Sequence, residues 1–158
     1  RADKMDSGFQ IPDAGWKKPM GEVRYDIVKE APVDAIVALY EDGGWWEESP
    51  EARSIIPGMI RGSFCFMIAR SPEGRIVGMA RVISDGLSDA YIQDVVVLKE
   101  CRGQGVGREL IRRLTAFCVD RKIGWIGLVA EPGTQEFYEG LGYGPLAGYQ
   151  PMLYGKRR

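Results

Sequence analysis

The chain has 158 residues, with 21 Lys and Arg against 22 Asp and Glu, so its formal net charge is −1. This length is enough for one domain with a substantial hydrophobic core, and the balanced charge excludes an overall field that would attract nucleic acid or an anionic membrane. The chain has no His, which excludes Ser-His-Asp and Cys-His hydrolases and requires any general base to be another group.

The N-terminal residues 1–20 combine Gly, Pro, Lys and Asp without periodicity, which predicts a flexible arm. The ordered domain is then expected over residues 21–155. Its first element is a half-buried strand over 23–27, where apolar and charged residues alternate. Apolar residues recur at helical spacing from 35 to 40, and Gly43–Gly44 is expected to end this first helix.

Cap and turn residues mark the next elements. Ser49-Pro50 is typical of a helix N-terminus, and this second short helix is expected to end near Pro57–Gly58. The turn sequence Ser-Pro-Glu-Gly at 71–74 separates two apolar runs. These runs predict an antiparallel hairpin with strands over 64–69 and 75–83.

The second half of the chain alternates strands and helices. A long amphipathic helix is expected over 106–119, because its apolar residues are three and four positions apart. The other expected elements are a strand over 90–98, a strand over 125–130, a short helix over 134–141 and a last strand over 150–154. This order predicts a single α/β domain with a mixed sheet.

Three glycines, Gly103, Gly105 and Gly107, lie between the strand over 90–98 and the long helix. The N–H groups at a helix N-terminus lack intrahelical partners, and glycine lets a ligand approach them, so this pattern predicts an anion site, typically for phosphate. A P-loop would need Lys after its last glycine, and a Rossmann fingerprint would need a third glycine, but Arg108 stands at both positions. The alternative is a structural turn at the start of the helix.

The segment Arg-Gly-Gln-Gly-Val-Gly at 102–107 follows the strand sequence IQDVVV at 92–97. It resembles the acyl-CoA pyrophosphate loop of the GCN5-related N-acetyltransferases (GNAT). The sequence EFYEGLGY at 136–143 is similar to the FYxxLGF-like segment of the same family. This resemblance covers Glu22 to Tyr154 and implies the GNAT fold, a mixed and mostly antiparallel sheet flanked by helices, with splayed central strands.

The resemblance also implies an activity, the transfer of an acetyl group from acetyl-CoA to a primary amine by direct attack in a ternary complex. The pantetheine arm is expected to pair with the backbone of the strand residues Val95, Val96 and Val97. The pyrophosphate is expected to bind the loop residues Arg102, Gly103, Gln104, Gly105, Val106, Gly107 and Arg108. Surface charge at a helix end is the alternative role for the two arginines.

The catalytic groups follow from the same resemblance. Tyr138, in the FY segment, is expected to protonate the departing CoA thiolate as a general acid. The identity of the base stays open between Asp94, Glu47 and an ordered water, because Asp94 could instead orient the loop by hydrogen bonding. Cys101 is expected to be a small buried residue and not a nucleophile.

The acceptor is expected in the region between the first two helices, where Trp45 and Trp46 precede Glu47 and Glu48. An apolar wall with acid nearby suits an aliphatic or aromatic amine, through cation–π and charge contacts. The alternative is one core Trp and one surface Trp beside solvated acids. The stretches ARVISDG and AYIQDVVV resemble the small-amine branch of the family, which includes plant-type arylalkylamine acetyltransferases.

Other functions remain as alternatives to the acetylation of a small amine. Acetylation of protein lysine or N-terminal amines is the competing substrate class, and a non-catalytic acyl-CoA-binding regulatory module is the competing protein class. Homodimers are common in the family, and the last strand could supply their interface.

The remaining sequence features concern redox state, metals and membranes. Cys65, Cys101 and Cys118 are odd in number and contain no CxxC pair, which favours reduced structural thiols and no metal site. No apolar run reaches the roughly 18 residues of a membrane span, and the N-terminus lacks the apolar core of a signal peptide. A cytoplasmic location with no membrane partner is therefore expected.

Overall fold

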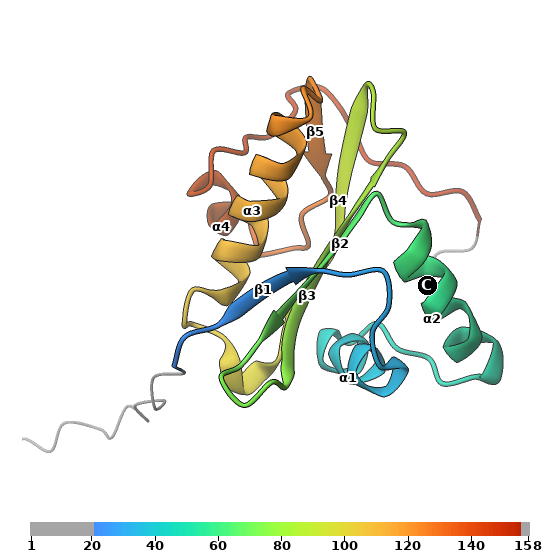
Figure 1. Ribbon diagram of the computed structural model, residues 1–158. Coiled ribbons are helices and arrows are strands. Elements are labelled where there is room, and N and C mark those ends of the chain that lie inside the picture. Colours follow the sequence, from blue (N-terminus) through green and yellow to red (C-terminus); the bar gives the residue numbers. More distant parts are fainter. Residues whose placement is uncertain (1–20, 156–158) are drawn as a thin grey trace, which may run out of the picture.

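The computed structural model describes residues 21–155, so the predicted arm over 1–20 lies outside the described residues. A five-stranded sheet has the order β1-β2-β3-β4-β5 (Figure 1). Its strands are β1 (Arg24–Ile27), β2 (Cys65–Arg70), β3 (Ile76–Ser84), β4 (Asp89–Val97) and β5 (Trp125–Leu128). The helices are α1 (Val33–Gly43), α2 (Pro50–Gly62), a short 3-10 turn (Lys99–Cys101), α3 (Val106–Asp120) and α4 (Gln135–Glu139).

The helices flank the sheet, with α1 and α2 on one side and α3 and α4 on the other (Figure 1). The pairs β1–β2, β2–β3 and β3–β4 are antiparallel, and β4–β5 is parallel. Helix α3 packs on β2, β3 and β4, and α1 packs on β3 and β4. The apolar face of α3 is buried as predicted, with Val106, Leu110, Ile111, Leu114 and Cys118 in the core. The mixed, mostly antiparallel α/β fold is therefore confirmed.

Helix α2 begins as predicted but runs further than predicted. The Ser49 hydroxyl accepts a hydrogen bond from the Ala52 N–H at 3.0 Å, and the helix continues through Pro57 to Gly62. The expectation of an end near Pro57–Gly58 is thus wrong. Proline in a helix interior costs about 3 kcal/mol, but Ile56 and Ile60 on either side of it are fully buried and hold the helix against the core.

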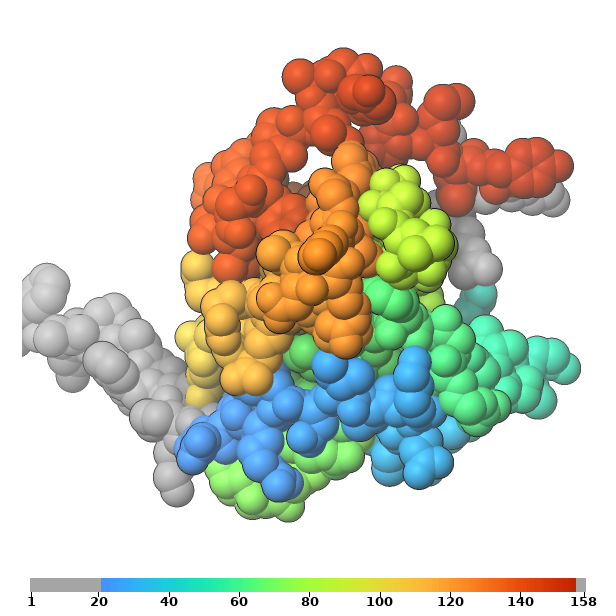
Figure 2. Space-filling view, turned by 45° about the horizontal axis from the view of Figure 1, so that its top comes forward, coloured from blue at the N-terminus to red at the C-terminus, as the bar shows by residue number. Residues whose placement is uncertain are grey.

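Two expectations at the edges of the sheet are also wrong. Ile27, expected on the buried face of the first strand, is half exposed at the end of edge strand β1. The strand expected over 150–154 does not form, and Tyr154 is fully exposed. The Tyr149 N–H instead bonds to the Leu146 carbonyl in a turn, and Pro151 lacks the N–H that a strand would use. Figure 2 shows this C-terminal segment, in red, standing out over the body of the molecule.

The predicted splay is present between β4 and β5, with β5 at the edge of the sheet. The two strands pair only from Asp89↔Trp125 to Ile92↔Leu128, and β4 then continues alone to Val97. The register of β4 against β3 shifts at this point, because two β4 residues, Asp94 and Val95, face the single residue Ala80. Such a bulge bends a strand and increases its twist. It therefore opens the gap in which the candidate site lies.

Candidate active site

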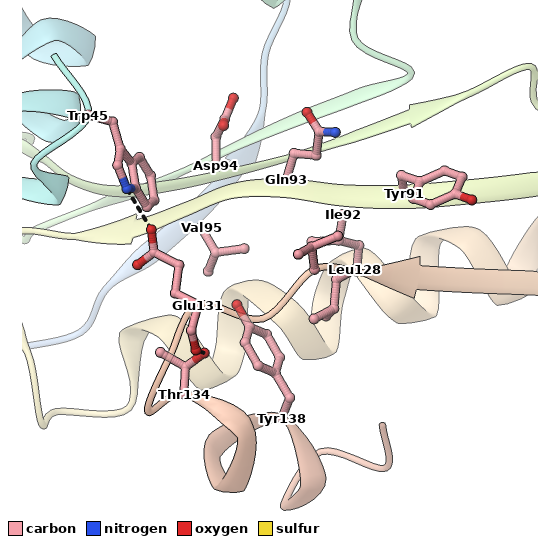
Figure 3. A pocket seen from close by; sticks show the side chains of 11 residues that line it. Trp45, Tyr91, Ile92, Gln93, Asp94, Val95, Leu128, Glu131, Thr134 and Tyr138 are labelled. Carbon is pink, nitrogen blue, oxygen red and sulfur yellow. Dashed lines mark hydrogen bonds between the residues drawn. The ribbon is translucent and has the colours of Figure 1, made fainter. Parts of the chain in front are cut away.

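A cavity of about 310 Å³ occupies the gap between β4 and β5 (Figure 3). One wall comes from β4 and the facing wall from the end of β5, the loop after it and α4. Its lining includes four residues predicted for the site, namely Trp45, Asp94, Val95 and Tyr138. Segments more than ninety positions apart thus meet here, which local sequence patterns do not specify.

Strand β4 offers backbone groups to this gap. The Leu98 N–H donates to the Val77 carbonyl at 2.9 Å on the β3 side. Because backbone direction alternates along a strand, Val95 and Val97 direct their groups to the open side. The side chains of Val96 and Val97 are instead buried in the core. This strand can therefore hold an extended ligand through its main chain.

The glycine segment leads into α3 with an unusual backbone. Gly103 and Gly105 have φ of +79° and +82°, in the left-handed region where glycine is favoured. Gly105 is the N-cap of α3, and no side chain caps the first turn. The first N–H groups of α3 thus have no side-chain cap, and the partial positive charge of the helix end favours an anion there.

The two predicted arginines contact the protein backbone. The Arg102 Nε donates to the Val97 carbonyl at 2.7 Å, and its Nη2 donates to the Asp42 carbonyl at 3.1 Å. Arg102 therefore joins the end of β4 to α1. Arg108 Nη1 donates to the Gly140 carbonyl at 3.3 Å, which joins the first turn of α3 to the end of α4. Both side chains stabilise the frame around the glycine segment.

Tyr138 lies on α4 with its hydroxyl toward the gap between β4 and β5 (Figure 3). Its ring packs edge-on against Phe137 and Tyr143, at centroid distances of 5.0 and 6.2 Å. Burial raises the pKa of Tyr138, and the charge of Glu131 and the neighbouring Tyr143 raise it further. The phenol is therefore protonated at neutral pH and able to donate its proton.

Asp94 is held by two neighbours. Its Oδ2 accepts hydrogen bonds from the Tyr40 hydroxyl at 2.8 Å and from the Arg81 Nε at 2.5 Å. The side chains of Arg81 and Asp94 are only 17% and 23% exposed, so solvent screens this ion pair weakly. The arrangement favours the orienting role for Asp94 that the sequence left open.

A second cavity of about 700 Å³ lies beside the first, next to the start of α2. It brings together the predicted acceptor residues Trp45, Trp46, Glu47 and Glu48. The Trp46 Nε1 donates to Glu48 Oε2 at 2.9 Å, and neither Trp is fully buried. Trp45 and Asp94 line both cavities. The two cavities therefore share a wall at the β4 bulge.

Three residues of this region were not predicted from the sequence: Tyr40, Arg81 and Glu131. The Trp45 Nε1 donates to Glu131 Oε1 at 2.7 Å, across the mouth of the first cavity (Figure 3). Arg81 had a detectable signal, because a charged residue interrupts the apolar run of β3. Tyr40 and Glu131 had no such signal, since their role depends on contacts between distant segments.

The family model described as the "Acetyltransferase (GNAT) family" matches residues 20–143, which is most of the chain. The chain belongs to the GNAT family. The splayed strands, the glycine segment before α3 and the Tyr of α4 all lie within the matched residues. No helix in residues 21–155 is long and apolar enough to cross a membrane. Within the same residues, no group of three or more His, Cys, Asp or Glu side chains could hold a metal ion.

Two plant relatives each match this GNAT chain over less than half of its length. It is 41% identical over 75 residues to serotonin N-acetyltransferase 2, chloroplastic, of Oryza sativa subsp. japonica, which covers 48% of this chain and 38% of that protein. It is 44% identical over 71 residues to histone acetyltransferase TAP1 of Glycine max, covering 45% and 31% respectively. The chain thus spans about a third of the length of these relatives.

Solved GNAT structures resemble the whole domain. The structure of the GNAT family protein SP0256 from Streptococcus pneumoniae TIGR4 matches with a TM-score of 0.73 at 20% identity. The match covers 87% of this chain and 100% of that chain. At this level of identity the likeness establishes the fold alone.

Proposed function

We propose that this GNAT domain transfers an acetyl group from acetyl-CoA to a primary amine, by direct attack in a ternary complex. The observation that carries the proposal is the pair of cavities that share Trp45 and Asp94 as a wall. A thioester in the first cavity and an amine in the second would meet at the β4 bulge. Direct attack needs this proximity and no covalent enzyme intermediate.

Acetyl-CoA would bind mainly through main-chain groups. The pantetheine arm would pair with the open edge of β4 at Val95, and the pyrophosphate would lie on the N–H groups from Gln104 to Arg108. Supporting this mode, the N-cap residue of α3 is Gly105, which supplies no side-chain cap, and the space around Gly103 and Gly105 is open. Because Arg102 already occupies the Val97 carbonyl, Val95 is the residue of β4 that remains to pair with the ligand.

The chemistry requires two proton movements. The amine nitrogen attacks the thioester carbonyl carbon, and a backbone N–H near Val95 would stabilise the oxyanion. The C–S bond then breaks, and Tyr138 would give its proton to the CoA sulfur. The raised pKa of Tyr138 supports this role as a general acid.

The base would be Glu131 acting through a water molecule. Glu131 lines the same cavity as Tyr138, and its Oε1 accepts the indole N–H of Trp45 at 2.7 Å. Asp94 is less suited, because its Oδ2 already accepts hydrogen bonds from Tyr40 and Arg81. Glu47 lines the second cavity but not the first, so it is better placed to attract the ammonium group of the acceptor.

The acceptor would be a small amine with an apolar body. The second cavity combines the two Trp rings with the carboxylates of Glu47 and Glu48, which suits a cation attached to an apolar group. The name of the rice relative refers to serotonin, a small amine, and supports this class. The name of the soybean relative refers to histones and supports protein lysine as the second candidate.

The proposed compartment is the cytoplasm, since Cys65, Cys101 and Cys118 are buried and form no disulfide in residues 21–155, as in a reducing environment. The name of the rice relative supports the chloroplast as the alternative. Expression of the full-length protein with a fluorescent tag would distinguish the two. Fluorescence that coincides with plastids would exclude the cytoplasmic proposal.

Thermal unfolding with acetyl-CoA, NAD or ATP tests the ligand first. A ligand that binds only the native state must raise the unfolding midpoint, and we expect a rise with acetyl-CoA alone. Thiol release in the presence of serotonin, a polyamine or a histone-tail peptide then identifies the acceptor class. A rise with NAD or ATP instead would contradict the transferase, and acetyl-CoA binding without thiol release for any amine would favour a regulatory module.

A further inference from the structure

We propose that Arg81, Asp94 and Tyr40 form a positioning unit that fixes the β4 bulge and connects the walls of the two cavities. These three side chains transfer no proton and do not contact the reacting atoms in the proposed mechanism. Its effect on the rate rests on the proposed acetyl transfer, because it sets the position of the backbone N–H groups near Val95. Its effect on the bulge itself does not depend on that function.

The bulge contains a backbone conformation that needs support. Asp94 has a φ of +52°, in the left-handed region that is uncommon for any residue except glycine, although Asp and Asn adopt it more often than other residues. A residue keeps such an unfavourable backbone conformation only where contacts with the surrounding structure stabilise it. The position directly precedes Val95, whose backbone faces the gap. An error in the Asp94 conformation would therefore move the main-chain groups that the reaction uses.

Two side chains supply this support from different elements. Tyr40 from α1 and Arg81 from β3 both donate to Asp94 Oδ2, at 2.8 and 2.5 Å. Arg81 also donates from Nη2 to Gln93 Oε1 at 3.2 Å, so it holds both Asp94 and the residue directly before the bulge. Burial and the Asp94 charge raise the pKa of Tyr40, which keeps its hydroxyl protonated as a donor.

The same unit reaches the acceptor cavity through aromatic packing. The Tyr40 ring is stacked on Trp46 at a centroid distance of 6.2 Å and contacts Trp45 edge-on at 6.4 Å. Gln93 lines the first cavity, and Trp46 lines the second. A chain of direct contacts thus runs from one cavity wall to the other through Asp94. The position of the acceptor wall and that of the bulge are therefore set together.

Four variants separate positioning from proton transfer. Tyr40→Phe removes one hydrogen bond and keeps the ring, Asp94→Asn keeps the side-chain shape without the charge, and Asp94→Ala removes both contacts. Asp26→Asn is the matched control, because Asp26 forms an ion pair with Arg70 at 3.4 Å on the same sheet, away from both cavities. For each variant, calorimetry gives the Kd for acetyl-CoA, and thiol release gives kcat and its pH profile.

We expect Tyr40→Phe to lower kcat about tenfold, as the loss of a hydrogen bond to a charged group does. The double variant Tyr40→Phe/Asp94→Ala should be no slower than Asp94→Ala, because both act through one unit. Asp94→Asn should have a higher kcat than Asp94→Ala, since Asn tolerates positive φ and its amide oxygen can accept the hydrogen bond from Tyr40. The wild-type rate should fall at acidic pH as the general base becomes protonated, and this acidic limb of the pH profile should stay in Asp94→Asn if Asp94 is not that base. An Asn variant as slow as the Ala variant, with that limb lost, would make Asp94 the base and overturn the proposal.

Hydrogen exchange tests the unit without any turnover. Amides over 93–97 should exchange faster in Tyr40→Phe than in wild type and Asp26→Asn, while the amides of β2 stay protected. Unchanged exchange over 93–97 would overturn the positioning unit even if acetyl transfer is confirmed. If the wild type fails to bind acetyl-CoA and exchange still rises in Tyr40→Phe, the proposed function is wrong and the unit stands.

Discussion

The two cavities on either side of the β4 bulge are built from different parts of the chain. The first combines the open backbone of β4 with the loop after β5 and with α4, next to the glycine segment before α3. The second is made almost entirely of side chains from α1, the segment after it and α2. The first cavity therefore depends on main-chain geometry, and the second depends on which side chains the chain carries.

This difference explains why sequence motifs predict the first cavity better than the second. The glycine segment and the FY segment lead to the first cavity, because a backbone site needs glycine and a fixed Tyr at defined spacings. The acceptor cavity has no comparable spacing rule, so the Trp pair and its acids indicate a class of ligand only. Substitutions in each cavity should accordingly change different kinetic constants, and the following predictions test that separation.

The largest effect is expected in the glycine segment. Gly105→Val places a β-branched residue at φ +82°, so the loop must change its backbone, and the Kd for acetyl-CoA should rise about 100-fold. Calorimetry measures this change. Gly148→Val is the matched control, because Gly148 also has a positive φ and open space around it. A Kd that is unchanged in Gly105→Val would remove the glycine segment from the binding site.

Tyr138→Phe should lower kcat on the order of 100-fold, as the loss of a general acid does, with little change in the Kd for acetyl-CoA. The raised pKa of Tyr138 predicts how kcat should change with pH. The phenol is protonated below that pKa, so the wild-type rate should hold through neutral pH and fall as the pH rises through it. The variant should lack this alkaline limb.

Tyr143→Phe is the control for this variant, because the Tyr143 hydroxyl pairs with Thr115 Oγ1 at 2.6 Å and is not among the groups that line the cavity. Its kcat should stay close to that of the wild type. Equal rates in wild type and Tyr138→Phe would assign the protonation of the thiolate to solvent or to another acid.

In the second cavity, Glu47→Gln should raise the KM for a cationic amine by about fivefold, a typical loss for one partly exposed charge contact. The Kd for acetyl-CoA should not change, because Glu47 does not line the first cavity. Glu51→Gln, in the first turn of α2 and outside both linings, serves as the control. A change in the acetyl-CoA Kd alone would reverse the assignment of the two cavities.

The smallest effect concerns the fold next to the acceptor cavity. Ser49→Ala removes the hydroxyl that accepts the Ala52 N–H, and the free energy of unfolding should fall by about 1 kcal/mol. Urea denaturation followed by circular dichroism measures this loss. Ser54→Ala, whose hydroxyl donates to the Glu51 carbonyl inside the same helix, should cost less. An equal loss in both variants would argue against Ser49 as the cap.

The sequence was sufficient for the order of elements through α4, which follows from local periodicity. It was also sufficient for three residues of the first cavity, Asp94, Val95 and Tyr138, because they belong to motifs of fixed spacing. It was insufficient at Pro57, where tertiary burial of Ile56 and Ile60 outweighs a local helix breaker. It also failed at 150–154, since strand propensity says nothing about whether a partner edge is within reach. The contacts of Asp94 with Tyr40 and Arg81 join three elements, and no pattern along one segment contains them.

The position of Trp45 in both cavity walls has a consequence for how this domain could diverge. Most of the acceptor wall lies between α1 and α2, apart from the glycine segment, so mutations there can change the amine while acetyl-CoA binding is preserved. Trp45 is different, because its indole also bonds to Glu131 at the first cavity. A lineage that changes its acceptor can vary Glu47 and Glu48, but a change at Trp45 alters the donor side at the same time.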